Sequence, residues 1–122
     1  MFKRFRSSRI NEETRLKNRE TFLHPKDFIL PIFLVEGKNI KQEITSMPEV
    51  YHFSVDKLLI ELEPLINNGL QSVLLFPVPE KKGIEQAWSD SGIIQTALPL
   101  IKNKFPKLEI ITDVCLCAFT ED

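Results

Sequence analysis

The sequence predicts an α/β fold with about three parallel strands and two helices, preceded by an extended N-terminal arm. Three short apolar runs alternate with two amphipathic segments along residues 25–122. Nearly continuous apolar runs are typical of strands in a parallel sheet covered by helices. The alternation of strands with helices favours right-handed crossovers between neighbouring parallel strands.

The first 24 residues differ from the rest in charge. They contain seven Lys or Arg and three Glu, a net charge of +4 in a chain whose total is −1. Their apolar side chains show no periodicity, which favours an arm that packs on a partner subunit; a flexible terminus is the alternative. The acidic residues argue against an organellar transit peptide. The apolar side chains are Phe2, Phe5, Ile10, Leu16, Phe22 and Leu23.

A first strand is predicted at residues 29–35, buried on both faces and ended by Glu36-Gly37. Pro31 indicates that the strand proper begins at or after that residue. Residues 37–53 then form a polar loop, with a turn near Met47-Pro48.

The first helix is predicted to begin after Ser54, a favourable N-cap, with Asp56 in its first turn. An apolar stripe at helical spacing marks its buried side. Gly69 suits the left-handed position after its end, and Pro64 predicts a kink. The stripe consists of Val55, Leu58, Leu59, Leu62 and Ile66.

The second half of the chain predicts a strand at residues 72–80, a second helix and a third strand at residues 107–117. Pro99 predicts a kink in that helix. Its apolar face would be Ile94, Ala97, Leu98, Ile101 and Phe105. Three strands cannot close a barrel, which needs about 250 residues. The sheet is therefore either a small domain or part of something larger, and the absence of a helix after the third strand favours the second.

Composition excludes several classes of protein. A hydrophobic content of 43% and a charged content of 27% are ordinary for a globular domain. A net charge of −1 argues against a nucleic-acid partner, and no apolar run reaches the length of a membrane span. Two cysteines without a secretory signal indicate reduced thiols and a cytoplasmic location.

The third predicted strand carries the candidate catalytic and metal-binding residues. Because side chains alternate along a strand, Asp113, Cys115 and Cys117 are expected on one face. Their neighbours Val114, Leu116 and Ala118 are expected on the other, under the helices. The carboxyl end of a parallel strand is where α/β folds assemble active sites.

Strand geometry favours a metal over a disulfide for the two thiols. On a regular strand their Cβ atoms would lie about 6.6 Å apart, whereas a disulfide needs about 3.8 Å. Two thiols are nevertheless fewer than the three or four ligands of a zinc site, and His24 and His52 lie in the arm and a loop. Inert buried cysteines are the alternative.

The segment "TDVCLCAFT" resembles the zinc-binding segment of the porphobilinogen synthases, also called delta-aminolevulinic acid dehydratases. Three other stretches resemble the same family in the same order, and linked motifs are more specific than a single C-x-C. They are "NRETFLHPKDFILPIFLVEG", "EITSMPEVYHFSVD" and "LLFPVPEKKG". "TED" at the end departs from the commoner Thr-Ser-His or Thr-Thr-His.

The resemblance implies a role for each matching residue. Cys115 and Cys117 match two of three cysteine ligands of a catalytic Zn²⁺, and the third would fall just beyond residue 122. Asp113 matches an active-site aspartate in a supporting role. The resemblance also implies a (β/α)₈ TIM barrel, with its first three strands in residues 25–122. Homo-octamers joined through the arm of residues 1–24, and Mg²⁺ in the full-length family, are implied as well.

The implied activity is that of a hydro-lyase in haem and tetrapyrrole biosynthesis, which condenses two molecules of 5-aminolevulinate into porphobilinogen. The family uses two Schiff-base lysines, whereas the lysines here fall in the predicted arm, loops and helices and match neither. We therefore expect an N-terminal fragment, roughly a third of the enzyme, that is inactive alone and binds zinc weakly. The alternative is a small non-enzymatic α/β domain that senses metal or redox state through its Cys pair.

Overall fold

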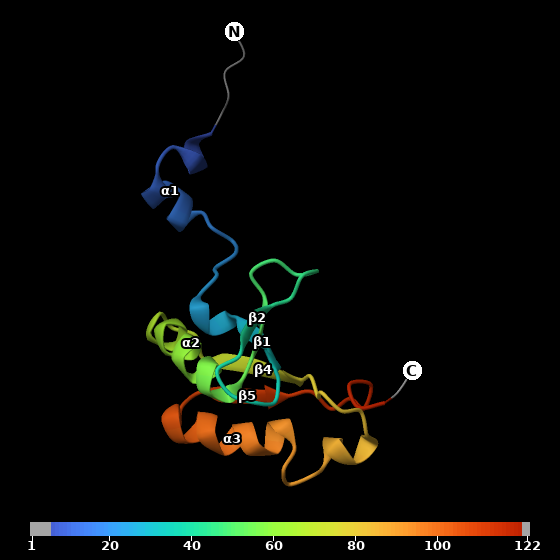
Figure 1. Ribbon diagram of the computed structural model, residues 1–122. Helices are drawn as coiled ribbons and strands as arrows, with labels where there is room; N and C mark the ends of the chain where they lie inside the picture. The colour runs from blue at the N-terminus through green and yellow to red at the C-terminus, as the bar shows by residue number, and fades with distance from the viewer. Residues whose placement is uncertain (1–5, 121–122) are drawn as a thin grey trace.

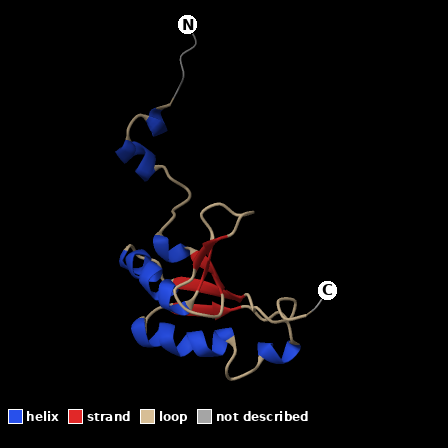
Figure 2. Cartoon of the chain, in the orientation of Figure 1, coloured by secondary structure: helices blue, strands red, loops and turns tan. Residues whose placement is uncertain are grey.

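The computed structural model describes residues 6–120, so Phe2 and Phe5 of the predicted arm lie outside the described residues. Its centre is a five-stranded sheet in the order β2-β3-β1-β4-β5 (Figures 1 and 2). The strands are β1 Ile29–Leu34, β2 Lys41–Glu43, β3 Tyr51–Phe53, β4 Ser72–Pro77 and β5 Glu109–Thr112. The helices are α1 Glu12–Lys17, α2 Val55–Asn67 and α3 Ile93–Lys104, with the 3-10 turns η1 Ser7–Arg9, η2 Pro25–Asp27 and η3 Ile84–Ala87.

The predicted α/β architecture is confirmed: β1, β4 and β5 are parallel neighbours joined through α2 and α3. Both helices contribute to one hydrophobic core against a single face of the sheet. The sheet is open, as the N-terminal strands of a barrel would be. The buried core consists of Ile32, Leu34, Leu58, Leu62, Val73, Leu75, Ile93, Ala97, Ile101 and Leu108.

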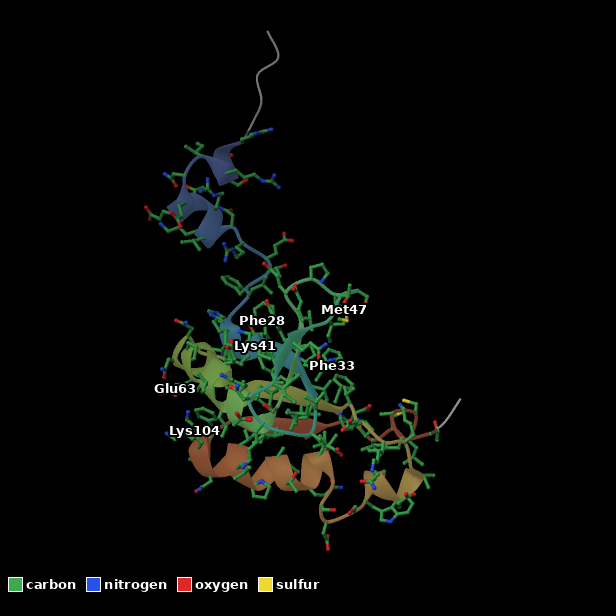
Figure 3. The ribbon with its side chains drawn as sticks, in the orientation of Figure 1. Phe28, Phe33, Lys41, Met47, Glu63 and Lys104 are labelled. Carbon is green, nitrogen blue, oxygen red and sulfur yellow. The ribbon has the colours of Figure 1, made fainter. Side chains whose placement is uncertain are left out.

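The other side of the sheet has no helix over it among the described residues, so β1 is not buried on both faces as predicted. Ile29 is 53% exposed and Phe33, labelled in Figure 3, is half-buried. Phe33 stacks on Phe76 of β4 with ring centroids 5.5 Å apart, and it makes an edge-to-face contact with His52 at a centroid distance of 6.2 Å. We call this side, with Phe33, His52 and Phe76, the helix-free face.

Pro31 lies inside β1 rather than before it, which corrects the predicted start of this strand. The amide of Val35 donates to Phe53 of β3, so the odd-numbered residues of β1 direct their backbone groups toward β3. The short strand β3 pairs only with Phe33 and Leu34. The missing N–H of Pro31 therefore falls where β1 has no partner on that side.

Two strands occur in the segment predicted to be a polar loop. β2 and β3 form an antiparallel hairpin in which Gln42 pairs with His52, and β3 also pairs in parallel with β1. With three residues each, these strands are too short to show periodicity. Lys41 of β2 forms an ion pair with Glu61 of α2, N–O distance 2.7 Å, which joins the hairpin to the helix layer.

Helix α2 begins after Ser54, as predicted, but the serine hydroxyl bonds a loop and does not accept a hydrogen bond from the backbone of its own helix. The hydroxyl group is fully buried; it accepts a hydrogen bond from the amide of Ile40 at 2.9 Å and donates to the Ile40 carbonyl at 3.3 Å. Asp56 in the first turn accepts from the amide of Asn39 at 2.9 Å. The loop after β1 is thereby fixed to the start of α2.

The end of α2 also follows the prediction. Gly69 has φ of +101°, and its amide donates to the Ile66 carbonyl at 2.9 Å. The amide of Leu70 reaches back to the Leu65 carbonyl at 3.1 Å. These two bonds define a Schellman motif, which pairs carbonyl groups that a helix end would leave free.

Helices α2 and α3 pack together at the end where α3 finishes. The Lys104 ammonium donates to the Leu59 carbonyl at 3.1 Å and to the Glu63 carboxylate at 2.9 Å. Lys104 and Glu63 are labelled at the left of Figure 3. Pro64 and Pro99 lie within α2 and α3 respectively, and the predicted kinks stay predictions.

The N-terminal segment extends away from the sheet (Figure 1). Residues 6–28 are exposed except Thr14, which is half-buried. Sequence periodicity did not reveal α1, which has only six residues; its N-cap Asn11 accepts a hydrogen bond from the Thr14 amide at 2.8 Å. None of the helices among residues 6–120 combines the length and apolar character needed to cross a membrane.

Candidate functional site

The candidate site lies in the loop that follows β5. Because β1, β4 and β5 are parallel, their carboxyl ends meet at one edge of the sheet. The amide of Asp113 donates to the Leu75 carbonyl at 3.3 Å, one residue beyond the end of β5. Residues 113–120, which we call the thiol loop, carry Asp113, Cys115 and Cys117 away from that edge.

The predicted strand at residues 107–117 is too long, because β5 ends at Thr112. Thr112 pairs with Leu75, so a continued strand would place Val114 opposite Pro77. The next ladder bond would then require an N–H from Pro77 to the Asp113 carbonyl, and proline has none. The alternation of side chains derived for a strand therefore does not apply to the thiol loop.

The thiol loop instead forms a turn around Leu116. The amides of Phe119 and Thr120 donate to the Leu116 carbonyl at 2.9 and 3.2 Å, and the Thr120 hydroxyl donates to the Cys117 carbonyl at 3.4 Å. The amide of Cys117 donates to the Cys115 sulfur at 3.4 Å. Both cysteines are exposed, free thiols.

Cys115 influences the ionisation of Cys117. The pKa of Cys117 is raised first by its side-chain hydrogen bond with Cys115, then by partial loss of solvent and by the neighbouring charges of Cys115 and Asp113. Cys117 therefore favours the neutral thiol in the metal-free chain. A cation bound at this pair would displace that proton, because metals take the thiolate.

The apolar side chains of the thiol loop do not pack as predicted. Val114 is 97% exposed and Leu116 is also exposed, whereas both were expected under the helices. The buried side chain is Phe119, at 7% exposure, and sequence reasoning did not single it out. Phe119 is the one large aromatic residue in this segment, and that alone could have predicted its burial, because aromatic side chains bury a large apolar area.

A cavity of about 270 Å³ opens beside the thiol loop. Asp113 and Cys115 of the thiol loop line it, together with Pro77 at the end of β4 and Gln95 of α3. The Gln95 side chain donates to the Ala87 carbonyl at 2.9 Å, which connects α3 with η3. The site thus combines an acid and a thiol of the thiol loop with an amide of α3.

The structure does not bring the histidines to this site. His24 lies in the arm segment, where its amide donates to Asp27, and His52 packs against Phe33 on the helix-free face. Within residues 6–120 no three His, Cys, Asp or Glu side chains lie close enough together to hold a metal ion. The described chain offers a pair of thiols with Asp113 nearby.

The fold and this edge define the class as a parallel α/β protein with polar and thiol groups at the carboxyl ends of its strands. A family model described as delta-aminolevulinic acid dehydratase matches residues 2–122. The chain belongs to this family, whose members are lyases. The match favours the first of the two functions considered from the sequence.

Relatives and a solved structure agree with that assignment. The chain is 44% identical over 122 residues to the delta-aminolevulinic acid dehydratase of Bacillus subtilis and 43% identical over 123 residues to that of Ruminiclostridium josui. The alignments cover 98% of this chain and 38% and 60% of the two relatives. The chain spans about 38% of the length of the B. subtilis relative.

The structural match covers 99% of this chain and 35% of a crystallised enzyme from Toxoplasma gondii, with a TM-score of 0.85 and 26% identity. That structure is a delta-aminolevulinic acid dehydratase (porphobilinogen synthase) in complex with its reaction product, porphobilinogen. The crystallised T. gondii enzyme thus contains the same arrangement of β1, β4, β5 and their two helices.

Proposed function

We propose that this chain supplies the first parallel strands and part of the metal site of a porphobilinogen synthase, which makes porphobilinogen from two molecules of 5-aminolevulinate. The observation that carries the proposal is the thiol loop at the carboxyl edge of the sheet, in a chain that belongs to this family. Asp113, Cys115 and Cys117 are the residues proposed to act there.

The donor set at the thiol loop fits a zinc ion in part. Cys115 and Cys117 are free and exposed, and the 3.4 Å contact between the Cys117 amide and the Cys115 sulfur holds them within one turn. Soft thiolates are ligands that zinc prefers, but a tetrahedral site needs one or two more. Bound zinc would act as a Lewis acid on one substrate.

The lysines of this chain do not serve as Schiff-base residues in the proposal. The sequence analysis located them in the arm, loops and helices, but Lys41 lies in β2. Its ammonium is paired with Glu61 at 2.7 Å and lies 4.9 Å above the Tyr51 ring, whereas a Schiff-base lysine needs a free, neutral amine. A polypeptide of residues 1–122 alone is therefore expected to form no porphobilinogen from 5-aminolevulinate.

The proposal is tested with a chimera. Residues 2–122 replace the aligned segment of the B. subtilis relative, which supplies the rest of that enzyme. We expect the chimera to form porphobilinogen in a zinc-dependent manner, and Cys115→Ser with Cys117→Ser to abolish that dependence together with most of the activity. Ser89→Ala with Ser91→Ala, a double change at a half-buried and an exposed serine outside the thiol loop, is the control for a paired substitution.

Two outcomes of the chimera experiment count against the proposal. A folded chimera with no activity would show that these residues cannot replace the segment of the relative. Full activity of the chimera without both cysteines would show that the thiol loop takes no part in the reaction. The proposal would then lose the observation on which it rests.

The proposal extends to the N-terminal segment. Residues 1–24 are proposed to form an arm on a neighbouring copy within a homo-octamer, separate from the barrel residues 25–122, in a cytoplasmic enzyme. The exposure of Ile10, Leu16, Phe22 and Leu23 supports a partner for this segment. Removing residues 1–24 from the chimera should reduce its mass in solution below that of the octamer; an unchanged mass would contradict this role.

A further inference from the structure

Two hydrogen bonds attach the thiol loop to a second loop, which has no part in the function proposed above. Lys82 and Gly83 lie between β4 and η3. The Lys82 ammonium donates to the Ala118 carbonyl at 2.7 Å, and the Gly83 amide donates to the Phe119 carbonyl at 2.9 Å. Two consecutive carbonyl groups of the thiol loop are therefore held by two consecutive residues of the other loop.

The side chain of Phe119 adds an apolar contact at the same place. It is 7% exposed and lines the cavity beside the thiol loop together with Pro77, Ala87 and Ile94. Pro77 ends β4, Ala87 ends η3 and Ile94 lies in the first turn of α3. The carboxyl part of the thiol loop is thus fixed by a buried ring and two hydrogen bonds to the segment that follows β4.

The amino part of the thiol loop has little support of its own. Asp113, Val114, Cys115, Leu116 and Cys117 are all exposed, so they bury little apolar surface that could offset the entropy of ordering them. The cysteines lie between two fixed points, the Asp113 amide on Leu75 and the Ala118–Phe119 carbonyls. Loosening the second point would release the turn that holds both sulfur atoms.

We propose that Lys82, with the Gly83 amide and Phe119, positions the cysteine pair for metal binding. Lys82 is a positioning residue, because its ammonium reaches a backbone carbonyl next to Cys117 and acts on the thiols only through the loop. This inference rests on the proposed function of the cysteines as metal ligands. A preorganised pair of thiolates binds a metal more tightly than a mobile pair, because less ordering accompanies binding.

The test compares Lys82→Met with Lys81→Met in the full chain, with Lys82→Arg as the conservative variant. Lys81 is an exposed neighbour, and both methionine variants remove one positive charge. Co²⁺ is the probe, because its thiolate charge-transfer absorption reports sulfur coordination directly. We expect Lys82→Met to weaken Co²⁺ binding by roughly three- to tenfold, the effect of losing one solvent-exposed hydrogen bond, while Lys81→Met leaves it unchanged. Lys82→Arg should restore most of the affinity.

Amide hydrogen exchange gives a second readout that needs no metal. In Lys82→Met the amides of Gly83, Phe119 and Thr120 should exchange faster, while amides in β1 and β4 keep their protection. If exchange in Lys82→Met equals that in Lys81→Met, Lys82 does not hold the loop and the inference is wrong. If exchange rises but Co²⁺ affinity is unchanged, the loop does not position the thiols and the inference is equally wrong.

The same measurements separate this inference from the proposed function. If the unchanged chain gives no thiolate charge-transfer band with Co²⁺, the cysteines are not metal ligands in this chain; the proposed function then loses its main support, and the positioning role is overturned with it. If the band is present in the unchanged chain and equally strong in Lys82→Met, the proposed function stands and only the positioning role fails.

Discussion

Replacing Gly69 by alanine tests how strongly the end of α2 depends on its backbone geometry. Gly69 has φ of +101°, a conformation that costs an L-residue about 1–2 kcal/mol. An added Cβ would also lie 3.2 Å from the Cβ of Pro25, where the chain enters the sheet domain. Loss of glycine's freedom in the unfolded chain opposes this cost by about 0.4–1 kcal/mol.

A second glycine provides the matched control. Gly83 has φ of 162°, which is extended backbone that any residue adopts, and its nearest obstacle is the end of the flexible Glu85 side chain at 2.5 Å. Gly83→Ala therefore keeps the unfolded-state effect without the strain. The difference in free energy of unfolding between Gly69→Ala and Gly83→Ala should be about 1–2 kcal/mol, with Gly69→Ala the less stable.

Urea unfolding of both variants and the unchanged chain, followed by circular dichroism, measures this difference. The slope against urea concentration should be the same in all three, since the exposed surface on unfolding does not change. Equal free energies of unfolding for the two alanine variants would refute the reasoning. They would show that alanine adopts the left-handed backbone conformation of position 69 without a cost in stability.

The remaining predictions concern the start of α2. Ser54→Ala should destabilise the fold by about 1–3 kcal/mol in urea unfolding, because the half-buried Ile40 amide loses its acceptor; Ser46→Ala, at an exposed loop position, should not. The Ser54 hydroxyl, followed by the Asn39 amide, lowers the pKa of Asp56. The ionised carboxyl thus stabilises the fold above its ordinary pKa of about 4, and this contribution is lost as the pH falls through the lowered pKa. Asp56→Asn should therefore be less stable than the unchanged chain at pH 7 and equally stable in strong acid; a difference that persists at low pH would contradict this assignment.

The parts of the fold that the sequence predicts are those where local chemistry and packing agree. Gly69 ends α2 because glycine suits a left-handed backbone position in any surroundings. Ser54 begins α2 as predicted, although its hydroxyl bonds Ile40 of the preceding loop in place of the helix backbone. The hairpin of β2 and β3 was not predicted, because its strands depend on pairing with β1 rather than on their own pattern. Burial of β1 on both faces was predicted from its apolar run, yet Phe33 and Phe76 stack on the helix-free face.

The thiol loop shows why a residue pattern can indicate the right chemistry with the wrong geometry. The sequence analysis treated Asp113, Cys115 and Cys117 as alternating positions on a strand, but the length of β5 is set by its neighbour β4. Once Pro77 falls opposite Val114, the ladder lacks an N–H donor and the chain turns away from the sheet. The distance argument against a disulfide assumed strand spacing and does not hold for a turn.

What the turn does provide is two free thiols joined by the contact between the Cys117 amide and the Cys115 sulfur. A metal can use two sulfur atoms in a turn more readily than two on a regular strand, because a turn does not impose the strand's spacing between alternate residues. The turn must also be held in place, so that less ordering accompanies binding. Lys82 and Phe119 are the residues through which the structure can do so.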